Sequence, residues 1–242
     1  LCENGSRDAT RELGAALAVP VGNLKIDAPP PPVDLAGHKK LSAALAGRSV
    51  WLAASTHPGE DDIAAVAHLA MKGARPDLLT IIVPRHPDRG PFIARLLSKA
   101  GLKVALRSEG KLPDASTEIY IADTIGELGL FYNLVPVAFV GGSLVPHGGQ
   151  NPVEALKLGA AVVTGPHWRN FADAYEELLS SGGCALVSEV NDLATAVLLL
   201  LEDAQARARM MSRAEGALGR MGGALPRTIA EIERFPPPRA TL

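Results

Sequence analysis

The sequence predicts an α/β domain built on a doubly wound parallel sheet, and three observations lead to that prediction. Short apolar runs alternate with helical patterns along the middle of the chain. Few runs alternate apolar with polar residues, which indicates strands buried on both faces, as in a parallel sheet covered by helices. Nearly every run ends in Gly, Pro, Ser or Asn, so the connections are short, as expected for repeated βα units.

Seven apolar runs are the predicted strands, and helical patterns separate most of them. The predicted strands span residues 49–54, 78–83, 103–106, 118–122, 137–140, 161–164 and 184–187. The predicted helices span residues 61–72, 91–100, 127–134, 152–158 and 171–180. From Val190 the pattern is helical to Phe235, with one interruption near Gly222 and Gly223.

Two proline clusters mark the ends of the predicted folded body. Residues 29–32 are all proline, which favours an extended linker without backbone donors, and residues 236–238 close the last predicted helix. We therefore predict a remnant with a Pro-rich linker over residues 1–37 and a folded domain over residues 38–242. The chain begins at Leu1 without an initiator Met, which we interpret as the start of a processed or truncated product.

Composition excludes several classes of protein. The 24 Lys and Arg against 26 Asp and Glu leave no basic excess for a nucleic-acid partner, and 47% hydrophobic residues are too many for a disordered chain. Cys2 and Cys184 are too far apart for a disulfide framework or a metal knuckle, which favours a reduced, cytosolic protein. The longest apolar run, residues 196–201, is far shorter than the roughly 20 residues that span a bilayer, so we expect a soluble chain.

Ligands of doubly wound sheets bind outside the carboxyl ends of the strands, so the loops after the strands are the candidate site. In the first of them, residues 54–60, the hydroxyls of Ser55 and Thr56 and the amide of Gly59 could bind an anion at a helix N-terminus. Plain helix capping explains this loop equally well, because the acids at residues 60–62 complement the helix dipole and would repel a phosphate.

The second loop, residues 83–89, carries cationic side chains between prolines. Arg85 could make two parallel hydrogen bonds to a phosphate or carboxylate, and His86 could donate another. The alternative is a solvated turn that contains an Arg–Asp pair.

The third loop follows the fourth predicted strand. The backbone groups of Thr124, Ile125 and Gly126 would face the crevice and could read a base edge. Helix capping explains most of the residue choices here, with Thr124 or Asp123 as the N-cap and Glu127 in a capping box.

The fourth loop carries the most specific pattern. Its two Gly pairs, at residues 141–142 and 148–149, leave the backbone bare for a ligand. Capping explains Asn151 as the N-cap, Pro152 as the first helical residue and Glu154 as the reciprocal capping-box residue, but it leaves the Gly pairs without a purpose. A phosphate over the helix N-terminus, with Glu154 turned toward ribose hydroxyls, explains all of them together.

Several familiar site signatures are absent from the sequence. There is no G-x-G-x-x-G after a strand, no G-x-x-x-x-G-K-[ST], no H-E-x-x-H, no Cys/His cluster with metal spacing and no G-x-S-x-G elbow. We therefore expect no nicotinamide cofactor, no bound metal and no serine nucleophile. His38 and His68 are interpreted as structural or solvated histidines.

Five motifs follow one another along the chain. They are STHPGE at residues 55–60, VPRHPDR at 83–89, ADTIGELG at 122–129, FVGGSL at 139–144 with HGGQNPVEA at 147–155, and GPH at 165–167. In this order they resemble the C-terminal half of bacterial 3-deoxy-D-manno-octulosonic acid (Kdo) transferases. The segment GNLKID at residues 22–27 is similar to the interdomain segment of that family, and the resemblance covers roughly residues 21–201.

That resemblance implies a GT-B glycosyltransferase with two Rossmann-like domains, which transfers Kdo from CMP-Kdo to a lipid A precursor in lipopolysaccharide biosynthesis, at the cytoplasmic face of the bacterial inner membrane. Residues 38–242 would be its donor-binding domain, with CMP-Kdo or CMP as ligand and no metal. The implied contacts are Arg85 and His86 with CMP, the backbone of Thr124, Ile125 and Gly126 with the cytosine, Gly148, Gly149 and Gln150 with the phosphate, Asn151 and Glu154 with the ribose, and Ser55 and Thr56 with the donor sugar or phosphate.

The acidic catalytic base, the acceptor site and the membrane-binding region of that family belong to its N-terminal domain. The resemblance therefore implies no catalytic residue in this chain and no transfer activity of the chain alone. One departure follows the GPH motif, where the family commonly carries a small or apolar pair and this chain carries Trp168 and Arg169. That departure leaves the role of this loop open.

Two other functions stay open from the sequence. One is a different GT-B enzyme that uses a UDP-sugar, either a transferase or an epimerase, and a preference for uracil over cytosine would reveal it. The other is a non-catalytic nucleotide-binding module, which a reading frame extending upstream of Leu1 would refute.

Overall fold

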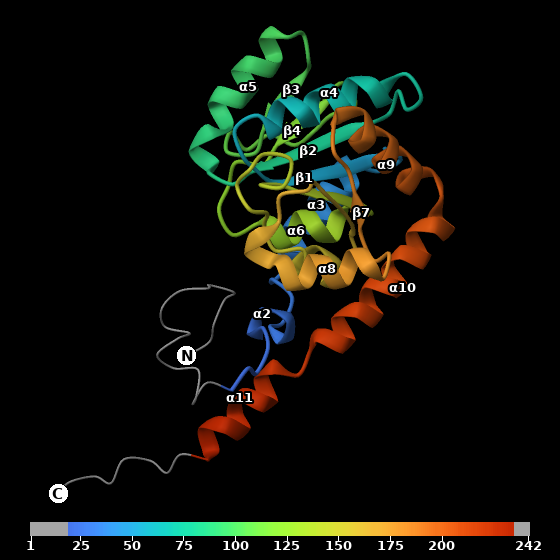
Figure 1. Cartoon of the computed structure of the whole chain (residues 1–242). Helices are drawn as coiled ribbons and strands as arrows, with labels where there is room; N and C mark the ends of the chain where they lie inside the picture. The colour runs from blue at the N-terminus through green and yellow to red at the C-terminus, as the bar shows by residue number, and fades with distance from the viewer. Residues whose placement is uncertain (1–18, 235–242) are drawn as a thin grey trace, which may run out of the picture.

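A seven-stranded parallel sheet forms the centre of the structure, a computed structural model that describes residues 19–234 (Figure 1). The strand order is β3-β4-β2-β1-β5-β6-β7, and every pairing is parallel. The strands are β1 (Val50–Thr56), β2 (Leu79–Pro84), β3 (Val104–Leu106), β4 (Ile119–Ile121), β5 (Val137–Val140), β6 (Ala161–Thr164) and β7 (Ala185–Leu186). All seven predicted strands are confirmed, with the predicted bounds for β5 and β6.

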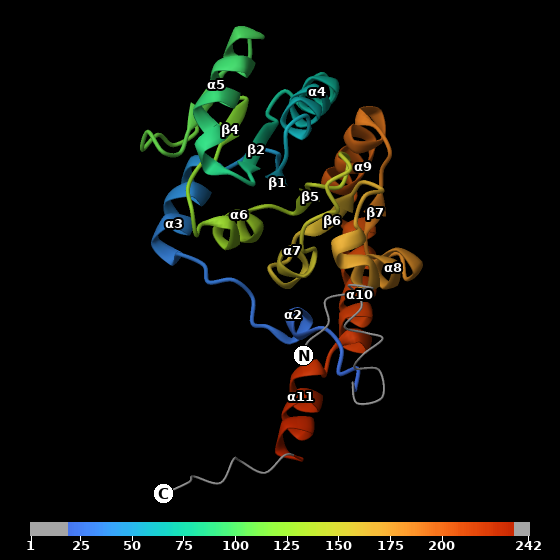
Figure 2. The same cartoon turned by 60° about the vertical axis from the view of Figure 1, so that its left-hand side comes forward.

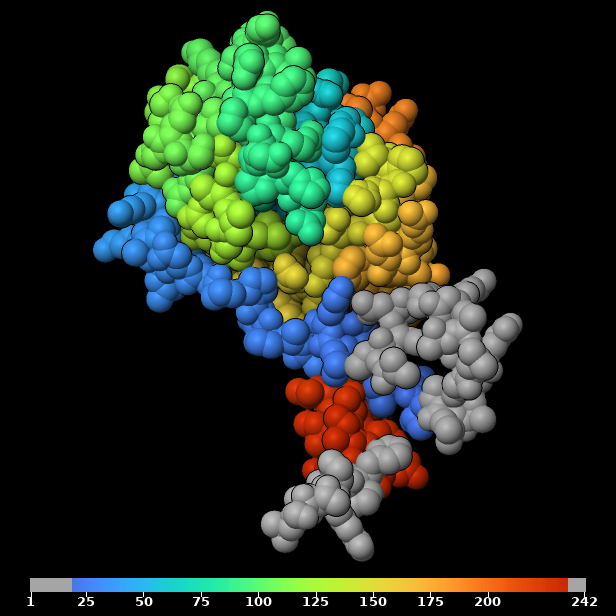
Figure 3. Space-filling view, turned by 90° about the vertical axis from the view of Figure 1, so that its left-hand side faces the viewer, coloured from blue at the N-terminus to red at the C-terminus, as the bar shows by residue number. Residues whose placement is uncertain are grey.

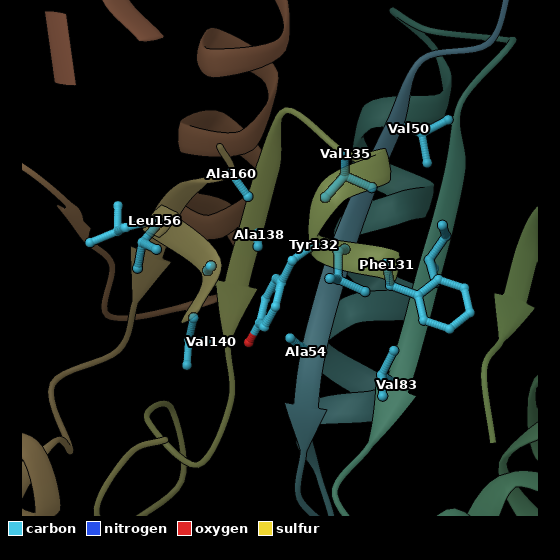
Figure 4. Close-up of a cluster of buried hydrophobic side chains, with 14 of the residues drawn as sticks. Val50, Ala54, Val83, Phe131, Tyr132, Val135, Ala138, Val140, Leu156 and Ala160 are labelled. Carbon is cyan, nitrogen blue, oxygen red and sulfur yellow. The ribbon is translucent and has the colours of Figure 1, made fainter. Parts of the chain in front are cut away.

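The strands are buried on both faces, as their unbroken apolarity predicts. Every residue of β1 is buried, and successive side chains enter opposite cores. Leu52 and Ala54 belong to one hydrophobic cluster, whereas Trp51 and Ala53 belong to the other. Figure 4 shows the first cluster, in which the Tyr132 ring of a covering helix lies beside Ala54 of β1 and Ala138 and Val140 of β5.

Helices cover both faces of the sheet, which confirms the doubly wound fold (Figure 2). The helices α4 (Glu60–Lys72), α5 (Gly90–Lys99) and α9 (Val190–Glu202) pack on the face that carries Trp51. The opposite face is covered by α3 (Leu35–Ala44), α6 (Leu128–Leu134), α7 (Val153–Lys157), α8 (Ala172–Ser180) and α10 (Ala204–Met221). Within residues 19–234, no helix combines the length and apolarity needed to cross a bilayer.

The helical C-terminal region is interrupted twice rather than once. Besides the predicted break before α11 (Ala224–Glu233), the chain breaks between α9 and α10 at Asp203. The carboxylate of Asp203 accepts hydrogen bonds from the amides of Gln205 and Ala206, at 2.9 and 2.8 Å, and so caps α10. The sequence prediction missed this break because the apolar pattern continues on both sides of it.

The segment before the sheet is folded against the body, although the sequence suggested a remnant. It forms α2 (Leu24–Asp27) and then α3, whose first turn is capped by Asp34. The predicted boundary between residues 37 and 38 falls inside α3, because Asp34 starts this helix and Leu41 is fully buried beneath it. Figure 3 shows the segment running over the surface of the body toward α11.

Some residues named from the sequence lie outside the described part of the chain. They are Leu1, Cys2, Phe235 and the second proline cluster. Cys184, by contrast, is a buried free thiol, and burial raises its pKa to about 12. Its reactive thiolate form is therefore scarce near neutral pH.

Candidate functional site

The strand order reverses between β1 and β5, so a topological switch point lies at the carboxyl ends of these two strands. From β1 the chain builds one side of the sheet through β2, β3 and β4, and it then returns to build the other side from β5. Because the strands are parallel, the loops after β4, β2, β1 and β5 lie along one edge. The structure therefore brings together the four loops that the sequence analysis selected.

Two of the predicted binding residues, Arg85 and His86, are exposed after β2. The backbone amide of Arg85 donates to the Thr56 carbonyl at 3.0 Å, which ties this loop to the end of β1. No ion pair engages the Arg85 side chain among residues 19–234. The Arg–Asp pair considered as an alternative is formed instead by Arg89, whose partner is Asp61 in the first turn of α4.

Thr56 does not face the crevice. Its side chain is fully buried, and its hydroxyl donates to Asp61 Oδ1 at 2.6 Å. The predicted contact of this hydroxyl with a ligand is therefore not available in this structure. Burial raises the pKa of Asp61, while the hydrogen bonds from Thr56 and Arg89 act in the opposite direction. The neighbouring Ser55 lies where the β1–β2 register shifts, with a φ of 54° that non-glycine residues seldom adopt.

Glu60 points under the turn that follows β5. Its carboxylate accepts hydrogen bonds from the backbone amides of Gly142, Ser143 and Leu144, at 2.6, 3.0 and 2.9 Å. Successive amides of this kind form an anion-binding nest, which here holds an internal carboxylate. A Cβ at Gly141 would lie 2.6 and 2.9 Å from the carbonyl oxygens of Ser55 and Ala54 and 2.9 Å from Glu60 Oε2, so the end of β1 and this buried acid together require a glycine at this position.

The second Gly pair also has internal partners. The amides of Gly148 and Gly149 both donate to the Gly142 carbonyl, at 3.1 and 2.7 Å, and the Gln150 amide donates to the Gly141 carbonyl at 3.2 Å. These amides are therefore not free to cradle a phosphate in this structure, contrary to the sequence-based interpretation. The loop between β5 and α7 closes on itself, and a Cβ on either glycine would collide with the loop after β6.

Asn151 and Glu154 lie together at the start of α7. Asn151 Oδ1 accepts from the Val153 amide at 3.1 Å, but the N-cap of α7 is Pro152 and its first residue is Val153, each one position later than predicted. Asn151 Nδ2 donates to Glu154 Oε1 at 3.0 Å, so Glu154 bonds the side chain and not the backbone amide that a capping box requires. The helix starts at Val153 and has only five residues, which weakens the argument for a phosphate held by its dipole.

The loop after β4 is not organised as a helix cap, because α6 begins without a side-chain cap. Asp123 accepts from the amide and hydroxyl of Ser108, at 2.9 and 2.6 Å, and Glu127 pairs with Arg107. The capping explanation is therefore wrong, since both acids hold the segment that follows β3. The backbone between these acids stays at the surface, where Ile125 is 88% exposed.

Three histidines from three loops gather at the crevice, and the sequence analysis had selected only His86. The ring centroid of His57 lies 3.7 Å from that of His147 and 6.3 Å from that of His86. Burial, helped by the two neighbouring imidazoles, lowers the pKa of His57 to about 4, so its ring is neutral near pH 7. Gln150 Nε2 lies 3.2 Å from His57 Nε2. Both missed histidines stand inside the motifs, beside residues selected for binding, and that placement is the signal that could have found them.

No metal centre accompanies these histidines in the part of the chain that the structure describes. Groups of three or more His, Cys, Asp or Glu side chains arranged to hold an ion are absent from residues 19–234. Beside the cluster, the loop after β6 borders a hollow of about 290 Å³ lined by Gly148, His167, Trp168 and Arg169. The pair that departs from the family motif therefore lies at the edge of the candidate site.

The fold is a doubly wound α/β domain with its candidate site at the switch point of the sheet, which is the architecture of one half of a GT-B glycosyltransferase. Its sheet and helices match trehalose 6-phosphate synthase from Burkholderia multivorans with a TM-score of 0.55 over 83% of this chain and 47% of that chain. At 17% identity this likeness shows the fold alone.

Similarity in sequence indicates the family more specifically than the fold does, although no family profile matches the chain. The chain is 40% identical to a 3-deoxy-D-manno-octulosonic acid transferase of Haemophilus influenzae over 78% of its own length and 44% of the relative. It is 35% identical to the Bordetella pertussis enzyme of the same name over 96% of its own length and 54% of the relative. The chain thus spans about half the length of these curated relatives.

One solved structure corresponds to the same half. It is the C-terminal CMP-Kdo binding domain of WaaA from Acinetobacter baumannii, which matches with 31% identity and a TM-score of 0.72 over 76% of this chain and 96% of that chain. The chain therefore belongs to the 3-deoxy-D-manno-octulosonic acid transferase family, in which it corresponds to the C-terminal domain.

Proposed function

We propose that this chain is the donor-binding domain of a glycosyltransferase that transfers Kdo from CMP-Kdo to a lipid A precursor. The observation that carries the proposal is the similarity to the CMP-Kdo binding domain of WaaA, of which the chain covers 96% at 31% identity. In the proposed enzyme the other half supplies the catalytic base, the acceptor site and the membrane contact, at the cytoplasmic face of the bacterial inner membrane. The chain alone then binds the donor and does not transfer the sugar.

The proposed donor site uses groups that the crevice leaves uncommitted. Arg85 and His86 are exposed beside the switch point, and a guanidinium can hold two phosphate oxygens at once. The surface backbone around Ile125 is the proposed partner of the cytosine edge. Glu154 keeps one carboxylate oxygen free of the Asn151 bond, and we assign that oxygen to the ribose hydroxyls.

The phosphate contact is assigned to side chains, because the amides of Gly148 and Gly149 are already engaged. Arg85 and the amide group of Gln150 are the proposed hydrogen-bond donors to this phosphate. When the bond between Kdo and CMP breaks, negative charge grows on the departing phosphate. Fixed cationic and hydrogen-bond donor groups stabilise that charge, and in this proposal they act in place of a metal.

Calorimetric titration of the chain with CMP, with UMP, AMP and NAD as controls, tests the proposed function. We expect CMP to bind selectively and Glu154→Ala to weaken CMP binding by at least about tenfold, because a hydrogen bond to a charged group is lost. The matched control is Glu176→Ala, which removes an exposed carboxylate from α8 and leaves the affinity unchanged.

Two outcomes would contradict the proposal. Equal affinity for UMP and CMP would favour an enzyme that uses a UDP-sugar. The second outcome is that no nucleotide binds, either to this chain or to a longer protein that includes the other half. The chain would then be a module without a donor site. Unchanged CMP affinity in Glu154→Ala, with a loss of stability, would instead return Glu154 to a purely structural role.

A further inference from the structure

Glu60, in the first turn of α4, is an acidic side chain that is completely removed from water. Its exposed fraction is 0%, whereas Asp62, two residues later, is exposed. A carboxylate removed from water is costly unless other donors replace the lost hydration. Here backbone amides do so: the His57 amide donates at 2.9 Å, and three successive amides of residues 142–144 donate from the other side.

The four donors come from two loops that are far apart in the sequence. The His57 amide belongs to the loop after β1, and the residues 142–144 belong to the loop after β5, which are the two loops of the switch point. Among residues 19–234 no cation pairs with Glu60. The carboxylate therefore joins the two loops through backbone amides alone.

The turn held by Glu60 supports the rest of the candidate site. The Gly142 carbonyl receives the amides of Gly148 and Gly149, which closes the loop that carries Gln150. On the other side, Ser143 Oγ accepts from the Gly165 amide at 2.9 Å, which fixes the loop after β6. Displacing the Glu60 carboxylate would release the turn on which these contacts depend.

We propose that Glu60 is a positioning residue for the donor-binding loop, acting as a built-in anion that fills the nest of residues 142–144 and keeps the donor phosphate out of it. That this loop binds the donor rests on the proposed function. That Glu60 fills the nest rests on the geometry alone. It has a chemical consequence. A variant without the carboxylate contains a vacant anion nest, which a small free carboxylate such as formate can fill.

Thermal unfolding of three variants in sodium formate and in sodium chloride at equal ionic strength tests the filled nest. In chloride, Glu60→Ala is expected to melt about 10 °C below the wild-type chain. Formate should recover much of that loss and should saturate as its concentration rises. The matched control Asp62→Ala removes an exposed carboxylate from the same helix turn, and it should respond to the two salts as the wild type does.

Glu60→Gln separates the charge from the shape of the side chain. Its amide still occupies the nest but presents N–H groups to N–H donors, so this variant is expected to lose stability without rescue by formate. A Glu60→Gln chain that melts and binds CMP like the wild type would overturn the proposal, as would a Glu60→Ala chain that responds to formate no more than Asp62→Ala. If Glu60→Ala does not fold in chloride, its refolding in formate supports the filled nest, and failure to refold in formate overturns it.

CMP titration in the two salts tests the positioning role. Glu60→Ala should bind CMP about tenfold more weakly in chloride and regain affinity in formate, which a general loss of stability would not produce below the melting temperature. Formate that restores the melting temperature but not the CMP affinity would overturn the positioning role. Failure of the proposed function is distinguishable, because the wild-type chain would then bind no CMP while the formate response of Glu60→Ala remained.

Discussion

At the scale of single residues, two buried histidines in different surroundings are neutral for the same main reason, which is burial. His57 lies in the crevice among other imidazoles, whereas His68 lies under the sheet on α4. His68 Nδ1 is 3.0 Å from Thr80 Oγ1, which also accepts from Trp51 Nε1 at 2.7 Å. The Thr80 hydroxyl thus joins the Trp51 indole to the His68 ring inside the core. Burial lowers the pKa of both histidines to about 4.

These two histidines make the stability of the chain depend on pH. A free imidazole has a pKa of about 6.5, so between that pH and about 4 the unfolded chain binds more protons than the folded chain. Above about pH 6.5 these histidines therefore do not reduce the free energy of unfolding, and as the pH falls from there toward 4 they reduce it progressively. Urea unfolding between pH 7 and pH 5, where most carboxylates stay ionised, should show the free energy of unfolding decreasing.

Variants assign this pH dependence to particular side chains. His68→Gln should flatten the decline, whereas the exposed His167→Gln should leave it unchanged. A free energy of unfolding that is constant from pH 7 to pH 5 in the wild-type chain would contradict the assignment of neutral, buried histidines.

At the scale of elements, the segment before the sheet joins the last helix to the body. The carboxylate of Asp27, at the end of α2, accepts from the amides of Gly223 and Leu225 at the start of α11, at 2.8 and 2.6 Å. From the other side, Lys157 of α7 donates to the Ile26 carbonyl at 2.6 Å. Segments almost two hundred residues apart in the sequence thus meet next to the helix that carries Glu154.

Asp27→Ala is expected to loosen α11 selectively. Removing both acceptors leaves the first amides of this helix without a cap, at a cost of about 1 kcal/mol. Hydrogen–deuterium exchange should show lower protection over residues 224–233 and unchanged protection in the central strands. Asp173→Ala on the exposed face of α8 is the matched control, and equal exchange of α11 in both variants would refute the capping role.

At the scale of the whole molecule, parallel topology creates the candidate site. Loops near residues 55, 85, 125 and 150 are distant along the chain, but they follow four adjacent strands and lie along one edge of the sheet. The helix α11 and the segment with α2 lie beyond the sheet, at the far end of α10 (Figure 1). Nucleotide binding at that edge would therefore draw on contacts from both halves of the sheet.

A ligand held by both halves of the sheet should stabilise the entire fold. If CMP binds only the folded chain, a concentration of about one hundred times its dissociation constant adds about 2.7 kcal/mol. For a domain of this size that corresponds to a rise in Tm of about 5–10 °C, measurable by differential scanning calorimetry. NAD should produce no shift, and a Tm unchanged by saturating CMP would contradict binding to the folded chain.

The amino-acid sequence by itself determined the sheet, most of its covering helices and the family. The seven strands were predictable because runs such as residues 137–140 and 161–164 are apolar on both faces. A strand buried between two helix layers needs such an unbroken apolar run, and the run is visible in the local sequence. The site was predictable as a set of loops, because parallel strands place their carboxyl ends at one edge. Ordered motifs in those loops then indicated the family without any structure.

Only the tertiary structure decided which partner each polar group takes. Glu60 bonds amides more than eighty residues away, Thr56 gives its hydroxyl to Asp61, and the amide of Gly149 closes on Gly142. The docking of α2 against α11 and the role of Asp123 beside Ser108 are further contacts of this kind. A hydrogen bond needs a distance of about 3 Å and a direction, and sequence spacing specifies these only within one turn or helix. Across loops from different strands, the folded backbone alone sets them.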